Sequence, residues 1–415
     1  RLKMRKRVVI TGLGILSPNG IGKDAFSEAT FKGVSGIKPV TLFDVSAFKV
    51  KNAGEISNFN PLDFLEAKSL RTLDRATKLV NSAAKLALDD SGFKITEDNT
   101  NSVGVVLGTA LGSIASISGF DREALKEGVR FVNPALFPNT VINSPASQIS
   151  IRFKIKGFNA TISTGLTSGL DAINYAADFI RLNRAKAVLA GGVEELCLET
   201  FLGFYKTGFL AGLEEGKVEL SCPFDKRRNG IVLAEAAAML VLEDLDSARE
   251  RNANIYAEIL GAGNAFEPYR ISKYKVTGSG LKKAMRQALE KSNIQAGDID
   301  YISAGANSTV GGDLLEALSI KDVFASKANV VYVSAIKSIV GESFSASGAL
   351  AAISASSAIS RQAVPAMINY QQKDPMCDLN FCVGRAIETE VNNVLINSFG
   401  PAGTNTSMVI TKYKE

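Results

Sequence analysis

The stretch “FNATISTGLTSGLDAINYAADFI”, residues 158–180, decides the fold. A β-rich run leads through a small-residue turn into a long helix, and short β-branched runs of this kind are typical of strands. Strand-to-helix turns are where α/β enzymes often place a nucleophile. The residue at the tip of this turn is Leu166, whose side chain can attack nothing.

The second half of the chain repeats the pattern in “VVYVSAIKSIVGESFSASGALAAISASSAI”, residues 330–359. Elsewhere, strands are predicted at the start of 102–113 and 186–195, a helix closed by Gly92 over 75–92, and a strand, helix and strand over 236–263. Strands that alternate with helices favour an α/β architecture with buried sheets. We therefore expect a duplicated chain in one compact body, with halves at 1–263 and 264–415 and a break near 264–280.

Composition excludes several classes of function. The chain has 415 residues, 46% hydrophobic and 21% charged, which is ordinary globular composition. It has no apolar run near the roughly 18 residues of a membrane span, and its start lacks a signal-peptide pattern, so we expect a soluble cytoplasmic protein without membrane contact. The net charge of +5 is modest, and the basic cluster within residues 1–7 is interpreted as a solvated terminus rather than a nucleic-acid arm.

The inventory of reactive side chains is also restricted. Four scattered cysteines form no CxxC pair, so we expect buried thiols and neither a metal site nor any cofactor. The chain contains no histidine, the commonest general base near neutral pH. Any catalytic proposal must therefore use Asp, Glu, Lys, Tyr or Cys.

Four stretches together resemble the β-ketoacyl-[acyl carrier protein] synthases. They are “RVVITGLGILSPNGIGKDAF” (7–26), “CPFDKRRNGIVLAEAAAMLVLED” (222–244), “KSIVGESFSASGA” (337–349) and “INSFGPAGTNTSMVI” (396–410). The resemblance spans essentially the whole chain and implies the thiolase fold, with two similar halves, five alternating α-β-α-β-α layers and an obligate dimer. Active members hold an acyl chain on a cysteine, use two histidines, and condense that chain with a malonyl unit on an acyl carrier protein.

Matched position by position, the three reactive groups of the family are absent from this chain. The family's “TACTSG” stands here as “TGLTSG”, which places Leu166 at the cysteine position. The two histidine positions hold Gly305, in “SAGANST”, and Glu342, in “KSIVGE”. The family's “SFGFGGTN” stands as “SFGPAGTN”, so Pro401, which has no N–H, replaces a residue whose backbone N–H completes the oxyanion hole.

Other polar residues near these positions are interpreted as structural. Without a histidine to activate it, Ser168 is expected to cap or pack its helix rather than attack. Glu342 with Lys337 could act as a base with an electrostatic partner, but half of a buried or interface ion pair is the favoured interpretation. Glu316 and Asp313 match family positions that support the fold.

A family counterpart without reactive groups is the chain-length factor, which forms a heterodimer with an active synthase in type II polyketide and polyene systems. Usual chain-length factors have Gln where this chain has Leu166. The resemblance implies a non-catalytic subunit that helps shape its partner's elongation tunnel. It also implies contact with an acyl carrier protein, either on this chain or only through the partner. By matching, Thr109, Leu111, Leu136 and Phe137 fall on or beside tunnel positions, although each could equally be a core residue.

Two alternatives stay open at this stage. One is new chemistry in the old cleft, such as decarboxylation of a malonyl group. The other is a homodimer that binds acyl chains or carrier proteins without turnover.

Overall fold

The computed structural model describes residues 6–68, 70–268 and 277–414, and most of their strands join one sheet. The first half of the chain contributes six of these strands: five in the spatial order β6-β5-β7-β8-β1, and β2 (Gly20–Ile21), which pairs with β1. Their bounds are β1 (Val8–Ser17), β5 (Val103–Gly108), β6 (Asn159–Ile162), β7 (Ala187–Glu194) and β8 (Ala236–Asp244). β5 runs parallel to β6 and β7, whereas β7–β8 and β8–β1 are antiparallel.

The second half repeats this order as β11-β10-β15-β16-β9. The strands are β9 (Ala257–Phe266), β10 (Tyr301–Ser303), β11 (Tyr332–Ser334), β15 (Asn393–Phe399) and β16 (Thr404–Thr411). β10 is parallel to β11 and β15, and the remaining pairs are antiparallel, as in the first half. The predicted duplication is therefore visible in strand order and direction, and the two units meet where β1 pairs with β9.

The division expected at residues 263 and 264 lies inside β9, which runs from Ala257 to Phe266. Because β9 occupies in the second unit the place of β1 in the first, we propose that the second half begins with β9. The break expected near 264–280 falls partly on residues 269–276, which lie outside the described residues.

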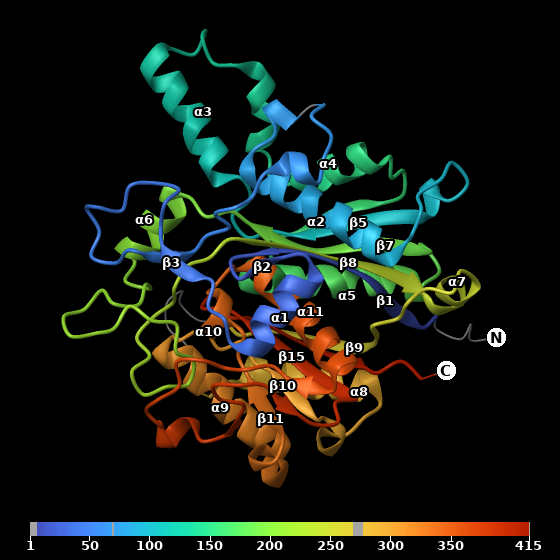
Figure 1. Cartoon of the computed structure of the whole chain (residues 1–415), viewed down its shortest axis with the longest axis vertical. Helices are drawn as coiled ribbons and strands as arrows, with labels where there is room; N and C mark the ends of the chain where they lie inside the picture. The colour runs from blue at the N-terminus through green and yellow to red at the C-terminus, as the bar shows by residue number, and fades with distance from the viewer. Residues whose placement is uncertain (1–5, 69, 269–276, 415) are drawn as a thin grey trace.

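Helices cover both units and fill the space between them (Figure 1). α2 (Arg75–Ser91) and α4 (Ser144–Phe153) pack on the outer face of the first unit, and α8 (Ser279–Ser292), with α9 (Val310–Phe324) against it, covers the second. α5 (Ser168–Arg181) and α11 (Ser345–Arg361) lie between the two units. The expected five-layered thiolase architecture is thus confirmed.

Small residues allow the central helices to approach closely. A Cβ atom added at Gly169 of α5 would lie 2.1 Å from the Ser345 carbonyl oxygen, and one at Gly192 of β7 would lie 2.5 Å from the same oxygen. In α11, every residue from Ser345 to Ile359 is buried. The Ala, Ser and Gly content of these segments is therefore required by the contact between layers.

The remaining elements lie around this framework. The predicted helix over 75–92 is α2, which is capped by Asp74 and ends at Gly92 with a φ of 62°. The other α-helices are α1 (Lys23–Lys32), α3 (Ile114–Glu127), α6 (Leu198–Lys206), α7 (Leu245–Glu250) and α10 (Lys337–Val340); among the short 3-10 helices are η4 (Pro134–Thr140) and η5 (Gly165–Thr167). The short strands are β2 (Gly20–Ile21), β3 (Ile37–Pro39), β4 (Asn52–Gly54), β12 (Ala363–Val364), β13 (Asn380–Phe381) and β14 (Ile387–Glu388).

Two further features concern the surface. Lys6 pairs with Asp244 and Asp246, and Arg7 pairs with Glu258, while the rest of the basic cluster, residues 1–5, lies outside the described residues. No helix within the described part of the chain is long and apolar enough to span a membrane.

Candidate functional site

The strand-to-helix turn is built as its sequence predicts. β6 ends at Ile162, η5 carries Leu166 at the tip, and α5 begins at Ser168. Gly165 has a φ of 74°, a conformation that side chains with a Cβ rarely adopt, which explains glycine at this point of the turn. Ser168 is fully buried; its hydroxyl donates to the Gly165 carbonyl (2.6 Å) and accepts from the Thr164 N–H (2.9 Å). This hydroxyl therefore closes the turn and does not face a substrate.

Leu166 packs into an apolar cluster. It lies with Leu111 and Phe204 against buried residues that include Phe344. The rings of Phe204 and Phe344 are 4.9 Å apart between centroids. The Leu166 carbonyl accepts a hydrogen bond of 3.1 Å from the Ser398 hydroxyl at the end of β15. The position of the lost nucleophile is thus occupied by a hydrocarbon side chain in hydrocarbon surroundings.

The second lost position, Glu342, carries a carboxylate that is fully engaged. Its Oε2 accepts from Lys337 Nζ and from Asn307 Nδ2, both at 2.8 Å. Its Oε1 accepts from the Phe344 N–H at 2.9 Å and from the Ser347 hydroxyl at 2.8 Å. Lys337 and Glu342 are both buried, so the sequence interpretation of a buried ion pair agrees with this geometry.

The third lost position, Gly305, has no space for a side chain. A Cβ atom at Gly305 would lie 2.9 Å from the Asn397 carbonyl oxygen and 2.9 Å from the Phe399 ring. The Gly305 carbonyl accepts from Lys337 Nζ at 2.9 Å, which links this position to Glu342. The adjoining cavity, bounded by Gly305, Lys337 and Ser347 among others, measures about 10 Å³ and has room for about one water molecule.

Glu316 and Asp313 hold the loop that carries Gly305. Glu316 Oε1 accepts from the Gly305 N–H and from Asn397 Nδ2, both at 3.0 Å. Asp313 accepts from the Asn307 N–H at 3.0 Å and from the Phe224 N–H at 2.8 Å. Burial raises the pKa of Glu316 to about 7 and that of Asp313 to about 6. These contacts are to backbone and amide groups of the fold.

Pro401 lies in the turn between β15 and β16. This turn is closed by bonds from the Gly400 N–H to the Thr404 carbonyl and from the Gly403 N–H to the Gly400 carbonyl, both at 3.0 Å. Gly400 lies beside Leu166, because a Cβ added there would be 3.3 Å from the Leu166 Cβ. The turn therefore lies beside Leu166, the position of the lost nucleophile. Its proline, however, offers no N–H to a developing oxyanion.

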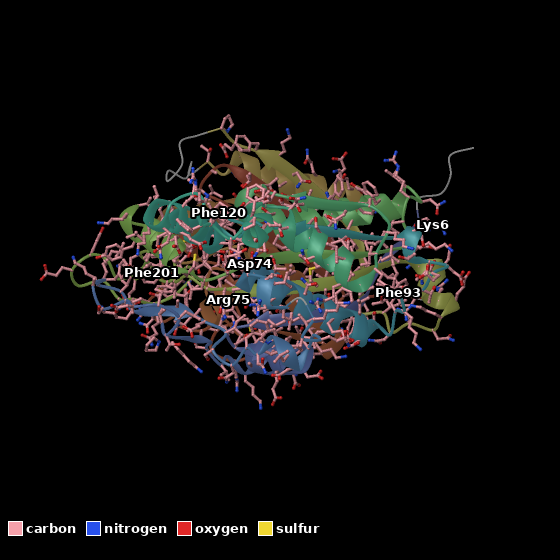
Figure 2. All side chains as sticks on the ribbon, turned by 90° about the horizontal axis from the view of Figure 1, so that it is seen from above. Lys6, Asp74, Arg75, Phe93, Phe120 and Phe201 are labelled. Carbon is pink, nitrogen blue, oxygen red and sulfur yellow. The ribbon has the colours of Figure 1, made fainter. Side chains whose placement is uncertain are left out.

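The four predicted tunnel residues occupy two neighbouring segments. Thr109 is buried and Leu111 half-buried where the chain leaves β5. Leu136 and Phe137 lie on η4, which packs against α3, and the Phe137 ring is 6.0 Å from that of Phe120. Seen from above, Phe120 of α3 and Phe201 of α6 lie on the same side of the molecule as Asp74 and Arg75, away from Lys6 (Figure 2).

Sequence reasoning missed three groups that complete these arrangements. Asn307 and Ser347 hold Glu342, and Glu194 at the end of β7 contacts Thr109 and Leu111. Glu194 was detectable in principle, because a carboxylate directly after a run of buried apolar residues is costly unless it is hydrogen-bonded.

Comparison with known proteins places the chain in a family. Residues 5–248 match the N-terminal domain of β-ketoacyl synthases and residues 256–371 match the C-terminal domain. The chain belongs to the β-ketoacyl synthase family. Among curated relatives, the 3-oxoacyl-[acyl-carrier-protein] synthase 2 of Coxiella burnetii is 37% identical over 98% of this chain and 99% of its own. The enzyme of the same name from Vibrio harveyi is 33% identical over 99% of this chain and 100% of its own.

Solved structures extend the comparison. The ishigamide ketosynthase/chain length factor matches with a TM-score of 0.92 and 31% identity, over 99% of this chain and 100% of that one. A type II polyketide synthase acyl-carrier protein in complex with its ketosynthase bound to the hexaketide matches with a TM-score of 0.91 and 26% identity, again over 99% and 100%. The chain is therefore similar along its full length both to proteins named as synthases and to a ketosynthase/chain length factor structure.

Proposed function

We propose that this chain is a non-catalytic subunit of the chain-length-factor type, which forms a heterodimer with an active ketosynthase and shapes the elongation tunnel of a type II polyketide or polyene synthase. The observation that carries this proposal is the state of the cleft. Leu166 occupies the nucleophile position, the Lys337–Glu342 pair occupies the second histidine position, and Gly305 leaves no room for a third side chain.

The names of the curated relatives do not decide between an active and an inactive subunit. Similarity over the whole chain shows that the fold is shared. Activity, in contrast, depends on individual side chains placed on that fold. In this chain those side chains cannot form a thioester with an acyl group or activate a nucleophile, because nucleophilic catalysis needs a thiol, hydroxyl or amine beside a base.

A catalytic base is not available at Glu342. Both carboxylate oxygens accept two hydrogen bonds each, and one donor is the ammonium group of Lys337. These four bonds occupy both carboxylate oxygens, so neither is placed to take a proton from a substrate. This arrangement argues against new chemistry, such as malonyl decarboxylation, that would rely on this residue.

Packing around Leu166 argues against storage of acyl chains in the chain's own cleft. Leu166, at the position where an acyl group would be attached, packs with Leu111 and Phe204 against the apolar cluster that contains Phe344. Close packing of side chains leaves little space for a bound hydrocarbon. An acyl-binding homodimer therefore receives no support from this region.

An exposed edge of the molecule supports a protein partner. β6 is the last strand of the first unit, and its residues are exposed or half-buried. Helices α4 and α5 flank β6, and they present Ile151 at 68% and Tyr175 at 40% exposure. On the adjoining η4, Phe137 is 57% exposed. An unpaired strand edge beside exposed apolar side chains is suited to sheet extension by a second subunit of similar fold.

Helix α3 supports the same conclusion. None of its residues is buried, and it stands at the margin of the molecule (Figure 1). The segment from α3 to η4 exposes Leu125 at 88%, Val129 at 82% and Phe131 at 73%. A helix without a buried face gains little from tertiary packing, so we propose that the partner subunit covers this segment.

The proposal predicts that Leu111→Ala, and likewise Leu136→Ala, will lengthen the products made by the complex, while phenylalanine at either position will shorten them. One methylene in an apolar pocket is worth about 1–3 kcal/mol, so the ratio of longer to shorter products should change by about tenfold or more. The measurement is the chain-length distribution from the reconstituted heterodimer, followed by mass spectrometry.

Leu182→Ala is a suitable matched control, because Leu182 is a 59% exposed leucine just beyond the end of α5, away from both tunnel segments. It should leave the distribution unchanged. If all four tunnel variants gave the wild-type distribution while the complex remained intact, the proposed role in chain length would be rejected.

A further inference from the structure

Glu194 is a buried carboxylate at the end of β7 with no cationic partner among the described residues. It is 1% exposed. Its Oε1 accepts from the Ser345 hydroxyl at 2.6 Å and from the Thr109 hydroxyl at 3.2 Å. It also accepts from the backbone N–H groups of Ala110 and Leu111, the latter at 3.3 Å. A buried carboxylate is tolerated when hydrogen bonds of this kind satisfy it.

These bonds converge on the short segment 109–112 that follows β5. β5 and β7 are parallel and in register at Gly108 and Gly192, so the chain leaving β5 passes across the end of β7, where Glu194 lies. The segment then turns at Gly112, whose φ is 60° and whose N–H donates to the Thr109 hydroxyl at 3.0 Å. Glu194 thus holds Thr109, Ala110 and Leu111 directly and Gly112 through Thr109.

The held segment places Leu111 in the apolar cluster that also contains Leu166. The next residue, Glu195, is a second acidic group, and Glu235, which pairs with Arg75, directly precedes β8. Burial raises the pKa of Glu194 to about 7, while the four donors oppose this change. The hydrogen bonds of the Glu194 side chain therefore hold Leu111, a predicted tunnel residue, in its position.

We propose that Glu194 is a positioning residue that sets the place of Leu111 at the end of the elongation tunnel and thereby helps to determine product length. This inference rests on the proposed function as a tunnel-shaping subunit. A purely structural role would predict lower stability without a change in product distribution, whereas the positioning role predicts a change in the distribution from an intact complex.

The test is Glu194→Gln in the reconstituted heterodimer. Glutamine keeps the size of the side chain but removes its charge, and a neutral amide oxygen accepts more weakly than a carboxylate from the N–H groups of Ala110 and Leu111. We expect amide hydrogen exchange at these two residues to accelerate by about tenfold or more. We expect the ratio of longer to shorter products to change by about three- to tenfold. Should the glutamine variant fail to assemble, Glu194→Asp, whose shorter side chain reaches fewer donors, decides the same question.

Ser345→Ala is the matched control, because it removes one donor to Glu194 but leaves the three bonds to segment 109–112. It should leave the product ratio unchanged. Amide hydrogen exchange at Ala110 and Leu111 should remain as slow as in the wild-type complex. An unchanged ratio in the Glu194 variants, together with a changed ratio in Leu111→Ala, would overturn this inference and leave the proposed function standing. An unchanged ratio in both sets of variants would overturn both.

Discussion

Lys337→Met should lower the free energy of unfolding by about 3–5 kcal/mol, because it removes one partner of a buried ion pair and leaves the other charged. Lys337 Nζ lies 2.8 Å from Glu342 Oε2, and both side chains are almost fully buried. The lysine also donates to the Gly305 carbonyl, so its loss removes that hydrogen bond as well, while Glu342 keeps its bonds from Asn307, Phe344 and Ser347. The measurement is chemical or thermal unfolding of the purified protein and, in parallel, of its complex.

A surface pair provides the control. Lys373 and Asp378 are also 2.8 Å apart, but their side chains are 63% and 55% exposed. Lys373→Met should therefore cost less than about 1 kcal/mol. The double variant Lys337→Met/Glu342→Gln should recover part of the loss, because the amide oxygen still accepts from neighbouring donors without a buried charge. Equal costs for Lys337→Met and Lys373→Met would show that the buried pair does not hold the cleft together.

Leu166→Cys should fail to restore carbon–carbon bond formation. The thiol would stand in apolar surroundings with no histidine anywhere in the chain to activate it. The missing N–H at Pro401 alone would cost about 10²- to 10³-fold in rate, judged by the loss of single oxyanion donors elsewhere. Intact-mass analysis detects acylation of the variant, and product analysis detects condensation.

Stepwise reversions separate the contributions to this loss. Leu166→Cys/Pro401→Phe returns a thiol and a backbone N–H but no base, so it should remain at background. Adding Gly305→His should also destabilise the fold, because even a Cβ atom there lies 2.9 Å from the Asn397 carbonyl oxygen. Condensation by Leu166→Cys alone would refute this account of the cleft.

Much of the fold could be predicted because its signals are local. The turn at Leu166, the helix closed by Gly92 and the repeated strand-to-helix units depend on residue spacing within short windows, and the structure has them at the predicted places. The start of the second half could not be placed as well. No sequence pattern separates β9 from the helix and loop before it. Only the pairing of β9 with β1 and β16 therefore shows to which unit it belongs.

The sequence was sufficient to predict which reactive groups of the family are absent. It was not sufficient to predict how the residues in their places are arranged. Matching of motifs identifies Leu166, Gly305, Glu342 and Pro401, but no local pattern indicates that Phe399 and Asn397 close over Gly305. The same holds for Glu194, whose contacts join β7, the end of β5 and the start of α11 across more than 80 residues of sequence. Roles for Thr109, Leu111, Leu136 and Phe137 stay predictions, because in the proposed heterodimer the partner would supply the other wall of the tunnel.

The most direct test of the central claim uses the heterodimer with a partner synthase whose catalytic cysteine is replaced by alanine. This complex is supplied with acyl and malonyl thioesters on carrier protein, and the present chain is examined by intact-mass spectrometry while products are quantified. We predict no acyl adduct on this chain and no condensation product, with activity returning when the partner's cysteine is restored. An acylated form of this chain together with a condensation product from the cysteine-free complex would contradict the account.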